Sequence, residues 1–209
     1  MHLINLAILI SGRGSNMDAI LSAIKIGKIQ NVKPSIVISN NPDAVGLKIA
    51  SEKFGVATKT LDYRYKGWAY DQRLIPVLEE CGVNKQEGVI CLAGFNRILS
   101  PEFVRTYKMR IMNIHPALLP SFQGLHAQKQ ALDYGVKVSG CTVHFVDEGV
   151  DTGPIILQRT VPVLASDTEE LLAERILKVE HELYLEALDL FSKGNIMIEG
   201  RRVHIKKTN

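Results

Sequence analysis

The sequence predicts an α/β fold, a single domain built on a mostly parallel, open sheet of about seven strands with helices on both faces. The main observation is that short apolar runs rich in β-branched residues alternate with amphipathic stretches through the first half of the chain. The length of 209 residues is sufficient for one well-buried core and does not require a second domain. We therefore expect residues 1–209 to fold as one unit.

Strand and helix signals follow one another in the first half of the chain. Apolar, β-branched runs predict strands over residues 6–10, 34–39, 57–61 and 88–92. The amphipathic stretches between them predict helices over about residues 16–26, 46–54 and 68–80. In the first helix, a core-facing apolar stripe at helical spacing is formed by Met17, Ile20, Leu21 and Ile24.

The second half is predicted to add more strands and the longest helix. An apolar run that begins at Met109 predicts a strand that leads into Asn113 and His115. A helix is expected near residues 127–134, followed by strands over 141–146 and 155–163. Overlapping capping boxes at residues 166–170 and apolar positions at helical spacing up to Phe191 mark the final helix. Two short runs, 196–198 and 203–205, predict a terminal hairpin.

The charge balance argues against a nucleic-acid or membrane partner. The chain has 25 basic and 22 acidic residues, and a net charge of +3 is too small to indicate a nucleic-acid surface or a polybasic membrane anchor. Basic residues cluster near the end, at Arg201-Arg202 and Lys206-Lys207, where we expect a solvated tail. Small molecules are therefore the expected partners, and the sequence is compatible with a monomer or a homodimer.

The cysteines and histidines indicate neither a disulfide framework nor a metal site. Cys81, Cys91 and Cys141 lie far apart without zinc-site spacing, which agrees with a reducing cytoplasm. The 6 histidines also lack metal-binding spacing, so no metal is expected. The apolar run over residues 3–10 is short and has no basic leader, so it predicts a buried strand rather than a signal peptide or a membrane span.

The segment Asn113-Ile114-His115-Pro116 is the strongest candidate for a catalytic site. Side chains alternate across a strand, so Asn113 and His115 are expected to project from the same face. Chemistry that builds an oxyanion needs a donor for the negative oxygen and a titratable group that moves protons. An amide and an imidazole match these needs, and Asp151 is a candidate to orient and stabilise the histidine. The alternative is a structural histidine, which is the commoner case for a single histidine near a strand end.

The glycine-rich segment SGRGSN, residues 11–16, lies between the first predicted strand and the first predicted helix. Its glycines let backbone N–H groups reach an anion at the N-terminus of the helix, so a phosphate would fit there. A dinucleotide fingerprint would need a third glycine at Met17 and an acidic residue after the second strand, where the chain has Ser39-Asn40-Asn41-Pro42. The pattern favours a monophosphate over NAD, with an ordinary glycine-rich turn as the alternative.

Glu180 interrupts the apolar face of the final predicted helix, one turn from Ile176 and one turn from Tyr184. A carboxylate in that position is poorly solvated, and a buried charge is costly unless it is paired. We therefore expect Glu180 to meet a cation. The physical argument alone favours a lysine or arginine of the protein over a ligand amine.

Six blocks of the sequence together resemble the glycinamide ribonucleotide formyltransferases of purine biosynthesis. In chain order they are SGRGSN, SNNPDAVGL, LAGFNRILSPEF, NIHPALLPSFQGLHAQKQAL, TVHFVDEGVDTGPII and VEHELY. The resemblance implies a Rossmann-like formyltransferase fold and formyl transfer from the co-substrate 10-formyltetrahydrofolate to the primary amine of glycinamide ribonucleotide. It also implies a nucleotide-phosphate-binding half, about residues 1–100, and a catalytic and folate-binding half, about residues 101–209.

The resemblance also implies roles for single residues. Asn113, His115 and Asp151 match the catalytic trio, and we expect Asn113 and a protonated His115 to stabilise the oxyanion while Asp151 supports the histidine and a proton relay. The positions that match the nucleotide site are Gly14, Ser15 and Asn16 at the phosphate and Glu180 beside the substrate. The positions that match the folate pocket are Arg97, Ile98, Leu99, Asp147, Glu148, Gly149 and Val150.

One position departs from the family pattern, and other functions stay as alternatives. Family members often carry an arginine that contacts folate where this chain has Gly67, and Arg64 and Lys66 are nearby substitutes. One alternative is another 10-formyltetrahydrofolate enzyme, either formyltetrahydrofolate hydrolase or the catalytic domain of methionyl-tRNA formyltransferase, although both usually carry an extra domain. Another is a non-catalytic nucleotide-binding module, which would leave Asn113, His115 and Asp151 without a common purpose.

Overall fold

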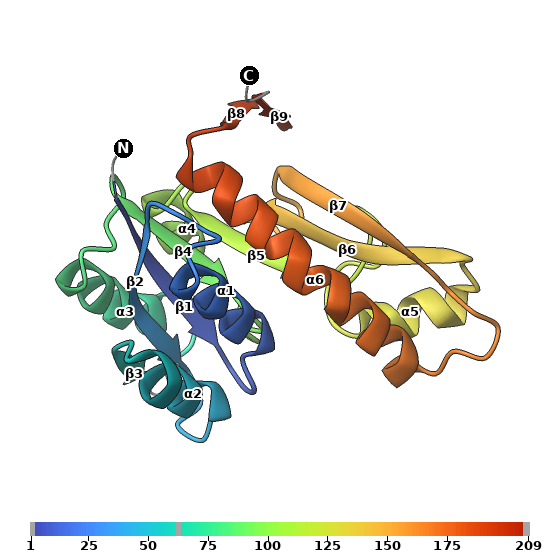
Figure 1. Ribbon diagram of the computed structural model, residues 1–209, viewed down its shortest axis with the longest axis horizontal. Coiled ribbons are helices and arrows are strands. Elements are labelled where there is room, and N and C mark those ends of the chain that lie inside the picture. Colours follow the sequence, from blue (N-terminus) through green and yellow to red (C-terminus); the bar gives the residue numbers. More distant parts are fainter. Residues whose placement is uncertain (1–2, 62–63, 207–209) are drawn as a thin grey trace.

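The centre of the structure is a seven-stranded sheet with the strand order β3-β2-β1-β4-β5-β6-β7 (Figure 1). The computed structural model describes residues 3–61 and 64–206. The parallel strands are β1 (Ile4–Ile10), β2 (Val32–Ser39), β3 (Thr58–Thr60), β4 (Gly88–Leu92) and β5 (Ile111–His115). The antiparallel strands β6 (Val138–Phe145) and β7 (Ile155–Pro162) extend the sheet beyond β5. The predicted fold class, an open and mostly parallel α/β sheet, is confirmed.

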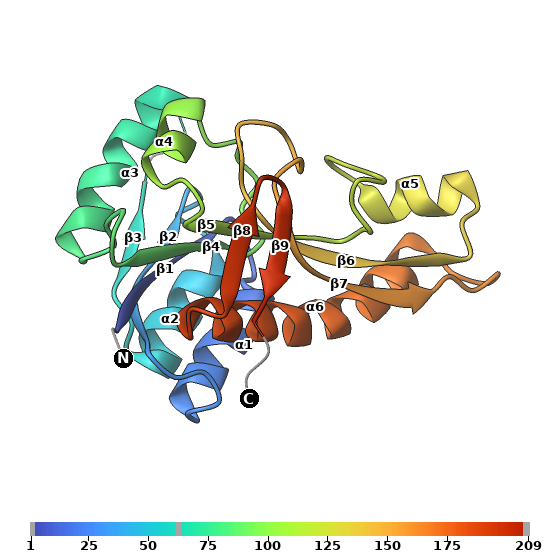
Figure 2. The same cartoon turned by 90° about the horizontal axis from the view of Figure 1, so that it is seen from above.

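Helices cover both faces of this sheet (Figure 2). One face carries α1 (Ser15–Lys25), α2 (Val45–Phe54) and α6 (Glu169–Ser192), and the other carries α3 (Trp68–Glu80) and α4 (Pro101–Thr106). The remaining helix, α5 (Ala127–Tyr134), precedes β6. Strand β1 shows the reason for the two layers, because Leu6, Ile8 and Ile10 join one hydrophobic cluster while Ala7 and Leu9 join the other. In residues 3–61 and 64–206, no helix is long and apolar enough to cross a membrane.

Two short elements differ from the predictions. Helix α4 was not predicted, although Ser100 caps it by accepting a hydrogen bond from the N–H of Phe103 and Pro101 occupies its first turn. Strand β5 begins at Ile111 rather than at Met109, because Met109 has a φ of 58° and cannot continue a strand.

Pairing between β6 and β7 contains a bulge. Ile156 is the extra residue, between the pairs Val143–Leu157 and His144–Ile155.

The predicted terminal hairpin is present as β8 (Ile196–Glu199) and β9 (Arg202–Ile205). Arg201 and Arg202 are exposed, as expected for a solvated basic segment, and the guanidinium of Arg201 also donates a hydrogen bond to the carbonyl of Thr152. The predicted tail also includes Lys207, which lies outside the described residues. The hairpin therefore contacts the body of the protein instead of standing apart from it.

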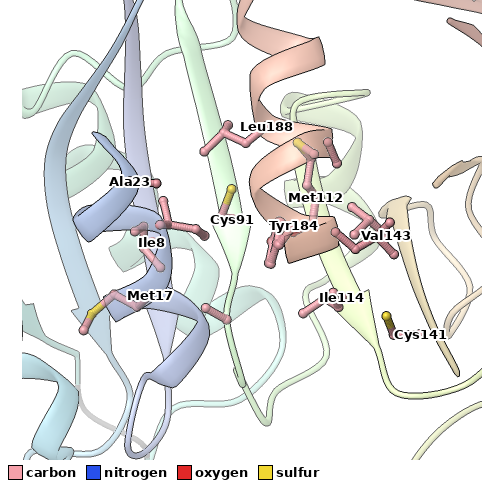
Figure 3. Packing of buried hydrophobic residues seen from close by; sticks show 14 of the residues in the cluster. Ile8, Met17, Ala23, Cys91, Met112, Ile114, Cys141, Val143, Tyr184 and Leu188 are labelled. Carbon is pink, nitrogen blue, oxygen red and sulfur yellow. The ribbon is translucent and has the colours of Figure 1, made fainter. Parts of the chain in front are cut away.

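Helix α6 is fixed to the middle of the sheet by Tyr184. This side chain is completely buried between β4 and β5, close to Cys91 and Met112 (Figure 3). Its hydroxyl lies 3.1 Å from the carbonyl oxygen of Leu92 and 2.9 Å from that of Met112, and its single hydrogen is shared between these two acceptors. Since Met112 directly precedes Asn113, the helix is held next to the predicted catalytic strand.

Replacement of Tyr184 by Phe is expected to destabilise the protein by about 1 kcal/mol, because it removes the hydroxyl donor from two carbonyl groups in a buried site. Urea unfolding of the wild type and Tyr184→Phe measures the change in the free energy of unfolding. The control is Tyr134→Phe, where the side chain is 81% exposed and no change is expected. Equal stability of the wild type and Tyr184→Phe would show that this hydrogen bond does not hold α6.

Candidate active site

A cavity of about 570 Å³ opens where β4 and β5 end. Its wall is assembled from six places in the chain: the start of α1, the loop after β4, the end of β5, the loop before α5, the end of β6 with the loop that follows, and the middle of α6. Loops at the carboxyl ends of parallel strands are where open α/β sheets bind ligands. The predicted residues that line it are Asn16, Arg97, Ile98, Leu99, Asn113, His115, Asp147, Gly149, Val150, Asp151 and Glu180.

The end of β5 places Asn113 and His115 as the alternation of a strand requires. Met112 and Ile114 join the hydrophobic cluster under α1 and α6, so Asn113 and His115 are on the opposite face of the sheet. Both side chains line the cavity together with Asp151. The structure therefore brings the three predicted catalytic residues to one place, while their catalytic role stays a prediction.

His115 is held at both ring nitrogens. Nε2 lies 2.8 Å from the carbonyl oxygen of Phe122, which can only accept, so Nε2 carries a hydrogen. Nδ1 lies 3.3 Å from Oδ2 of Asp151. Burial lowers the pKa of His115 below its ordinary value of 6.5, and the Asp151 carboxylate and the Phe122 carbonyl oppose this only in part. This direction favours the neutral ring in the resting site, and the protonated His115 expected to stabilise the oxyanion stays a prediction.

Asp151 has an unusual backbone and several contacts. Its φ is 54°, in the left-handed region that residues with a side chain seldom adopt. The N–H of Gly124 donates to its Oδ2 over 2.9 Å, and the side-chain amide of Gln123 donates to its main-chain carbonyl over 3.1 Å. Burial alone would raise the pKa of the Asp151 carboxyl, but contacts with His144, Gly124 and His115 together lower it. Asp151 is therefore the fixed negative charge of this site.

His144 is a site residue that the sequence analysis missed. Its Nδ1 lies 2.9 Å from the carbonyl oxygen of Phe145, so Nδ1 carries a hydrogen, and its Nε2 lies 3.2 Å from the side-chain nitrogen of Asn113. Nε2 also lies 3.6 Å from Oδ1 of Asp151. The observation that would have identified His144 is the antiparallel register, which puts it directly opposite Asn113. That register cannot be read from the sequence without knowing that β5 pairs with β6.

The glycine-rich loop turns from β1 into α1. Gly14 adopts a φ of 71°, and no side chain caps the first turn of the helix, so the backbone N–H groups of that turn can receive an anion. The loop is also packed closely on α2, because the N–H of Gly46 donates to the carbonyl of Gly12 over 3.1 Å. Gly14 and Ser15 lie beside Asn16 in sequence, but only Asn16 of these three lines the cavity.

Glu180 reaches the cavity from α6 and is 7% exposed. Its Oε2 accepts a hydrogen bond of 2.9 Å from the Asn16 side chain, and burial raises the pKa of its carboxyl. In the described part of the chain, no lysine or arginine forms an ion pair with it, so the protein cation that the physical argument alone favoured is wrong. A buried carboxylate next to a cavity, with an amide as its partner, is suited to receive a ligand amine.

The positions predicted to bind folate are divided by the structure. The cavity is lined by Arg97, Ile98, Leu99, Asp147, Gly149 and Val150. Glu148 is not among the lining residues, because its carboxylate forms an ion pair of 3.0 Å with Arg105. Arg97 stacks its guanidinium on the ring of Tyr70, 4.2 Å from the ring centre, and donates to the carbonyl of Tyr65. Arg64 and Lys66 are exposed and do not line the cavity, so a substitute for the missing family arginine stays a prediction.

The comparisons with known proteins agree on one family. The sequence profile of the family Formyl transferase matches residues 4–188. Phosphoribosylglycinamide formyltransferase of Escherichia coli is 43% identical over 197 residues, which is 92% of this chain and 89% of that protein. The Drosophila melanogaster trifunctional purine biosynthetic protein adenosine-3 is 46% identical over 198 residues, which is 92% of this chain but only 14% of that protein. This chain thus spans a small part of its trifunctional relatives.

A solved structure shows the same fold. Glycinamide ribonucleotide transformylase 1 from Symbiobacterium toebii superimposes with a TM-score of 0.92 at 48% identity, covering 99% of this chain and 95% of that one. The likeness extends through the glycine-rich loop, β5 and α6, the elements that form the cavity. The family match and these similarities place this chain in the formyl transferase family.

Proposed function

We propose that this protein transfers a formyl group from 10-formyltetrahydrofolate to the primary amine of glycinamide ribonucleotide. The name of its Escherichia coli relative, phosphoribosylglycinamide formyltransferase, supports the acceptor. The observation that carries the proposal is the convergence of Asn113, His115 and Asp151 with Glu180 and Asn16 in one cavity. This arrangement offers an oxyanion donor, a proton acceptor and a carboxylate for an amine within the same space. The cytoplasm is the compartment that fits a soluble pathway of this kind.

Asn113 stabilises the negative oxygen in this reaction. The substrate amine forms a bond to the formyl carbon, and the carbonyl π electrons move to the oxygen. One N–H of the Asn113 side chain is directed at His144, and the second is available to donate to this oxyanion. Because His144 fixes the amide plane, the donor is oriented before the charge develops.

His115 and Asp151 handle the proton of the attacking amine. The nitrogen becomes positive as its bond to carbon forms, and it loses a proton through water to His115 Nδ1. The new imidazolium is stabilised by Asp151, whose Oδ2 is 3.3 Å away. The proton then passes to N10 of the folate as the oxyanion collapses and the C–N10 bond breaks. The neutral His115 favoured by burial is the form that can accept a proton.

The nucleotide extends from the cavity to the glycine-rich loop beside it. Its phosphate lies against the uncapped first turn of α1 at Gly14, Ser15 and Asn16, where the helix dipole favours an anion. Glu180, hydrogen-bonded to Asn16, contacts the ligand near the amine. The folate lies against the backbone of residues 97–99 and the loop that begins at Asp147, which line another part of the wall.

An absorbance assay for tetrahydrofolate formation, run with and without glycinamide ribonucleotide, tests the proposal. Formation of tetrahydrofolate that requires the nucleotide is the expected result. Formation without the nucleotide would instead indicate a formyltetrahydrofolate hydrolase. No formation under either condition would indicate a nucleotide-binding module. In a separate measurement, transfer of an isotope-labelled formyl group to the nucleotide product identifies the acceptor.

Replacement of Asn113 by Ala is expected to reduce kcat by roughly 10²- to 10³-fold, because the amide acts mainly on the charge of the transition state. The dissociation constant of the nucleotide should change little. Steady-state kinetics and calorimetry of the same preparation separate the two effects. Near-normal turnover of Asn113→Ala would remove this residue from the mechanism.

His115 is expected to titrate below its ordinary value of 6.5 in the wild type, since burial lowers its pKa. In Asp151→Asn the midpoint should fall further, because the carboxylate charge that favours the imidazolium is lost. NMR titration of the imidazole C–H resonances measures both midpoints, and His126, which is exposed, is an internal reference. A midpoint that rises in Asp151→Asn would contradict the proposed coupling of the pair.

Replacement of Glu180 by Gln keeps the shape of the side chain but removes the charge that would face the substrate amine. We expect nucleotide binding to weaken roughly tenfold or more, as for the loss of a charged hydrogen-bond partner, while folate binding is nearly unchanged. Calorimetry with each ligand checks this. The control is Glu182→Gln on the same helix, whose carboxylate is exposed and pairs with Arg159. Equal losses for both ligands, or none for either, would mean that Glu180 is structural.

A further inference from the structure

We infer that Arg201, at the turn of the C-terminal hairpin, is a positioning residue for Asp151, because it holds the carbonyl of Thr152 and thereby fixes the backbone that carries the Asp151 carboxylate. The inference rests on the proposed function, since it concerns the catalytic step given to Asp151. The Nη2 group of Arg201 donates to the Thr152 carbonyl over 2.6 Å. Figure 2 shows the turn of the hairpin directed toward the loop between β6 and β7.

The backbone at Asp151 needs such support. Its left-handed conformation, with a φ of 54°, is unfavourable for a residue with a side chain and persists only where the surroundings impose it. On one side the loop before α5 supplies the Gln123 and Gly124 hydrogen bonds. On the other side is the next residue, Thr152. Its hydroxyl donates to Asp147 over 2.6 Å, and its carbonyl accepts a hydrogen bond from Arg201.

The loop closes tightly on itself at this point. A side chain at Gly153 would lie 1.8 Å from the carbonyl oxygen of Phe145, so only glycine fits between the loop and the end of β6. Within the loop, Asp147 accepts from both the N–H of Gly149 and the hydroxyl of Thr152. These contacts hold residues within the loop together, and the Arg201 hydrogen bond connects the loop to the C-terminal hairpin.

The hairpin is itself anchored, so it can act as a fixed support. A two-stranded hairpin alone is marginally stable in water. Here Ile196, Ile198 and Val203 pack against the main hydrophobic cluster, while Met197, on the other face, is 52% exposed. Arg201 does not line the cavity, so it acts through Asp151 and not on the substrate.

Three variants test this role. Arg201→Met keeps the length of the side chain but removes the donors, Arg201→Lys keeps a charged donor, and Arg202→Met makes the same change at the next residue. For Arg202 the described part of the chain contains no side-chain hydrogen bond or ion pair with another residue. Each variant is assayed with glycinamide ribonucleotide and 10-formyltetrahydrofolate over a range of pH, and amide hydrogen exchange is followed by mass spectrometry over residues 147–153.

The expected result for Arg201→Met is a kcat lower by roughly fivefold, which is the typical effect of one lost hydrogen bond, with an unchanged nucleotide KM. Its pH–rate profile should shift, since the surroundings of Asp151 set the His115 titration, and exchange over residues 147–153 should be faster. Arg201→Lys should recover part of the loss, and Arg202→Met should match the wild type.

The inference would be overturned if Arg201→Met matched Arg202→Met in kcat, in pH profile and in hydrogen exchange. It would also be overturned if Arg201→Met lost activity with an unchanged pH profile and unchanged exchange over residues 147–153. The exchange measurement needs no substrate. A wild type that does not formylate the nucleotide would therefore refute the proposed function alone, and the support given by Arg201 to the loop would still be measured.

Discussion

The docking of α6 on the sheet is the constraint on which the rest of the site depends. Tyr184 inserts its hydroxyl between the carbonyl groups of Leu92 and Met112, so the helix cannot slide along β4 and β5 without breaking buried hydrogen bonds. Glu180 lies one turn away on the same helix and therefore meets Asn16 on α1. One buried hydroxyl thus sets the distance between the helix that carries the carboxylate and the strand that carries Asn113.

Burial gives this site its charge pattern. It lowers the pKa of His115 and raises that of Glu180, so both groups are shifted toward their neutral forms. Asp151 is the exception, because its contacts more than offset burial and keep its carboxyl charged. In the proposed reaction, the charges that the site stabilises lie on the substrate amine and on the oxyanion. The electrostatic stabilisation is therefore gained only when the reactants and the transition state are present.

The sequence predicted most of the fold because its signals are local. The period of a strand places Asn113 and His115 on one face, and the polar segment at residues 166–170 marks the start of α6, where the N-cap is Thr168, whose hydroxyl accepts from the N–H of Leu171. Helix α4 was missed because a helix of 6 residues contains too few positions for a periodic pattern.

The parts that were not predicted depend on contacts between distant segments. Asn16 and Glu180 are 164 residues apart in sequence, so the partner of Glu180 follows only from the packing of α1 against α6. His144 joins the site through the pairing of β5 with β6, and the Arg201 contact depends on where the hairpin docks. The pKa direction of His115 also requires its burial, because the nearby carboxylate alone would raise it.

The bulge between β6 and β7 has a consequence for how this fold can vary. Ile156 is unpaired between His144–Ile155 and Val143–Leu157, and beyond it Thr142 pairs with Gln158, whose amide donates to the Leu119 carbonyl. A bulge absorbs one residue without altering the pairing on either side. Deletion of Ile156 would therefore remove the bulge and leave the pairs on either side of it, including those of His144 and Gln158, in place.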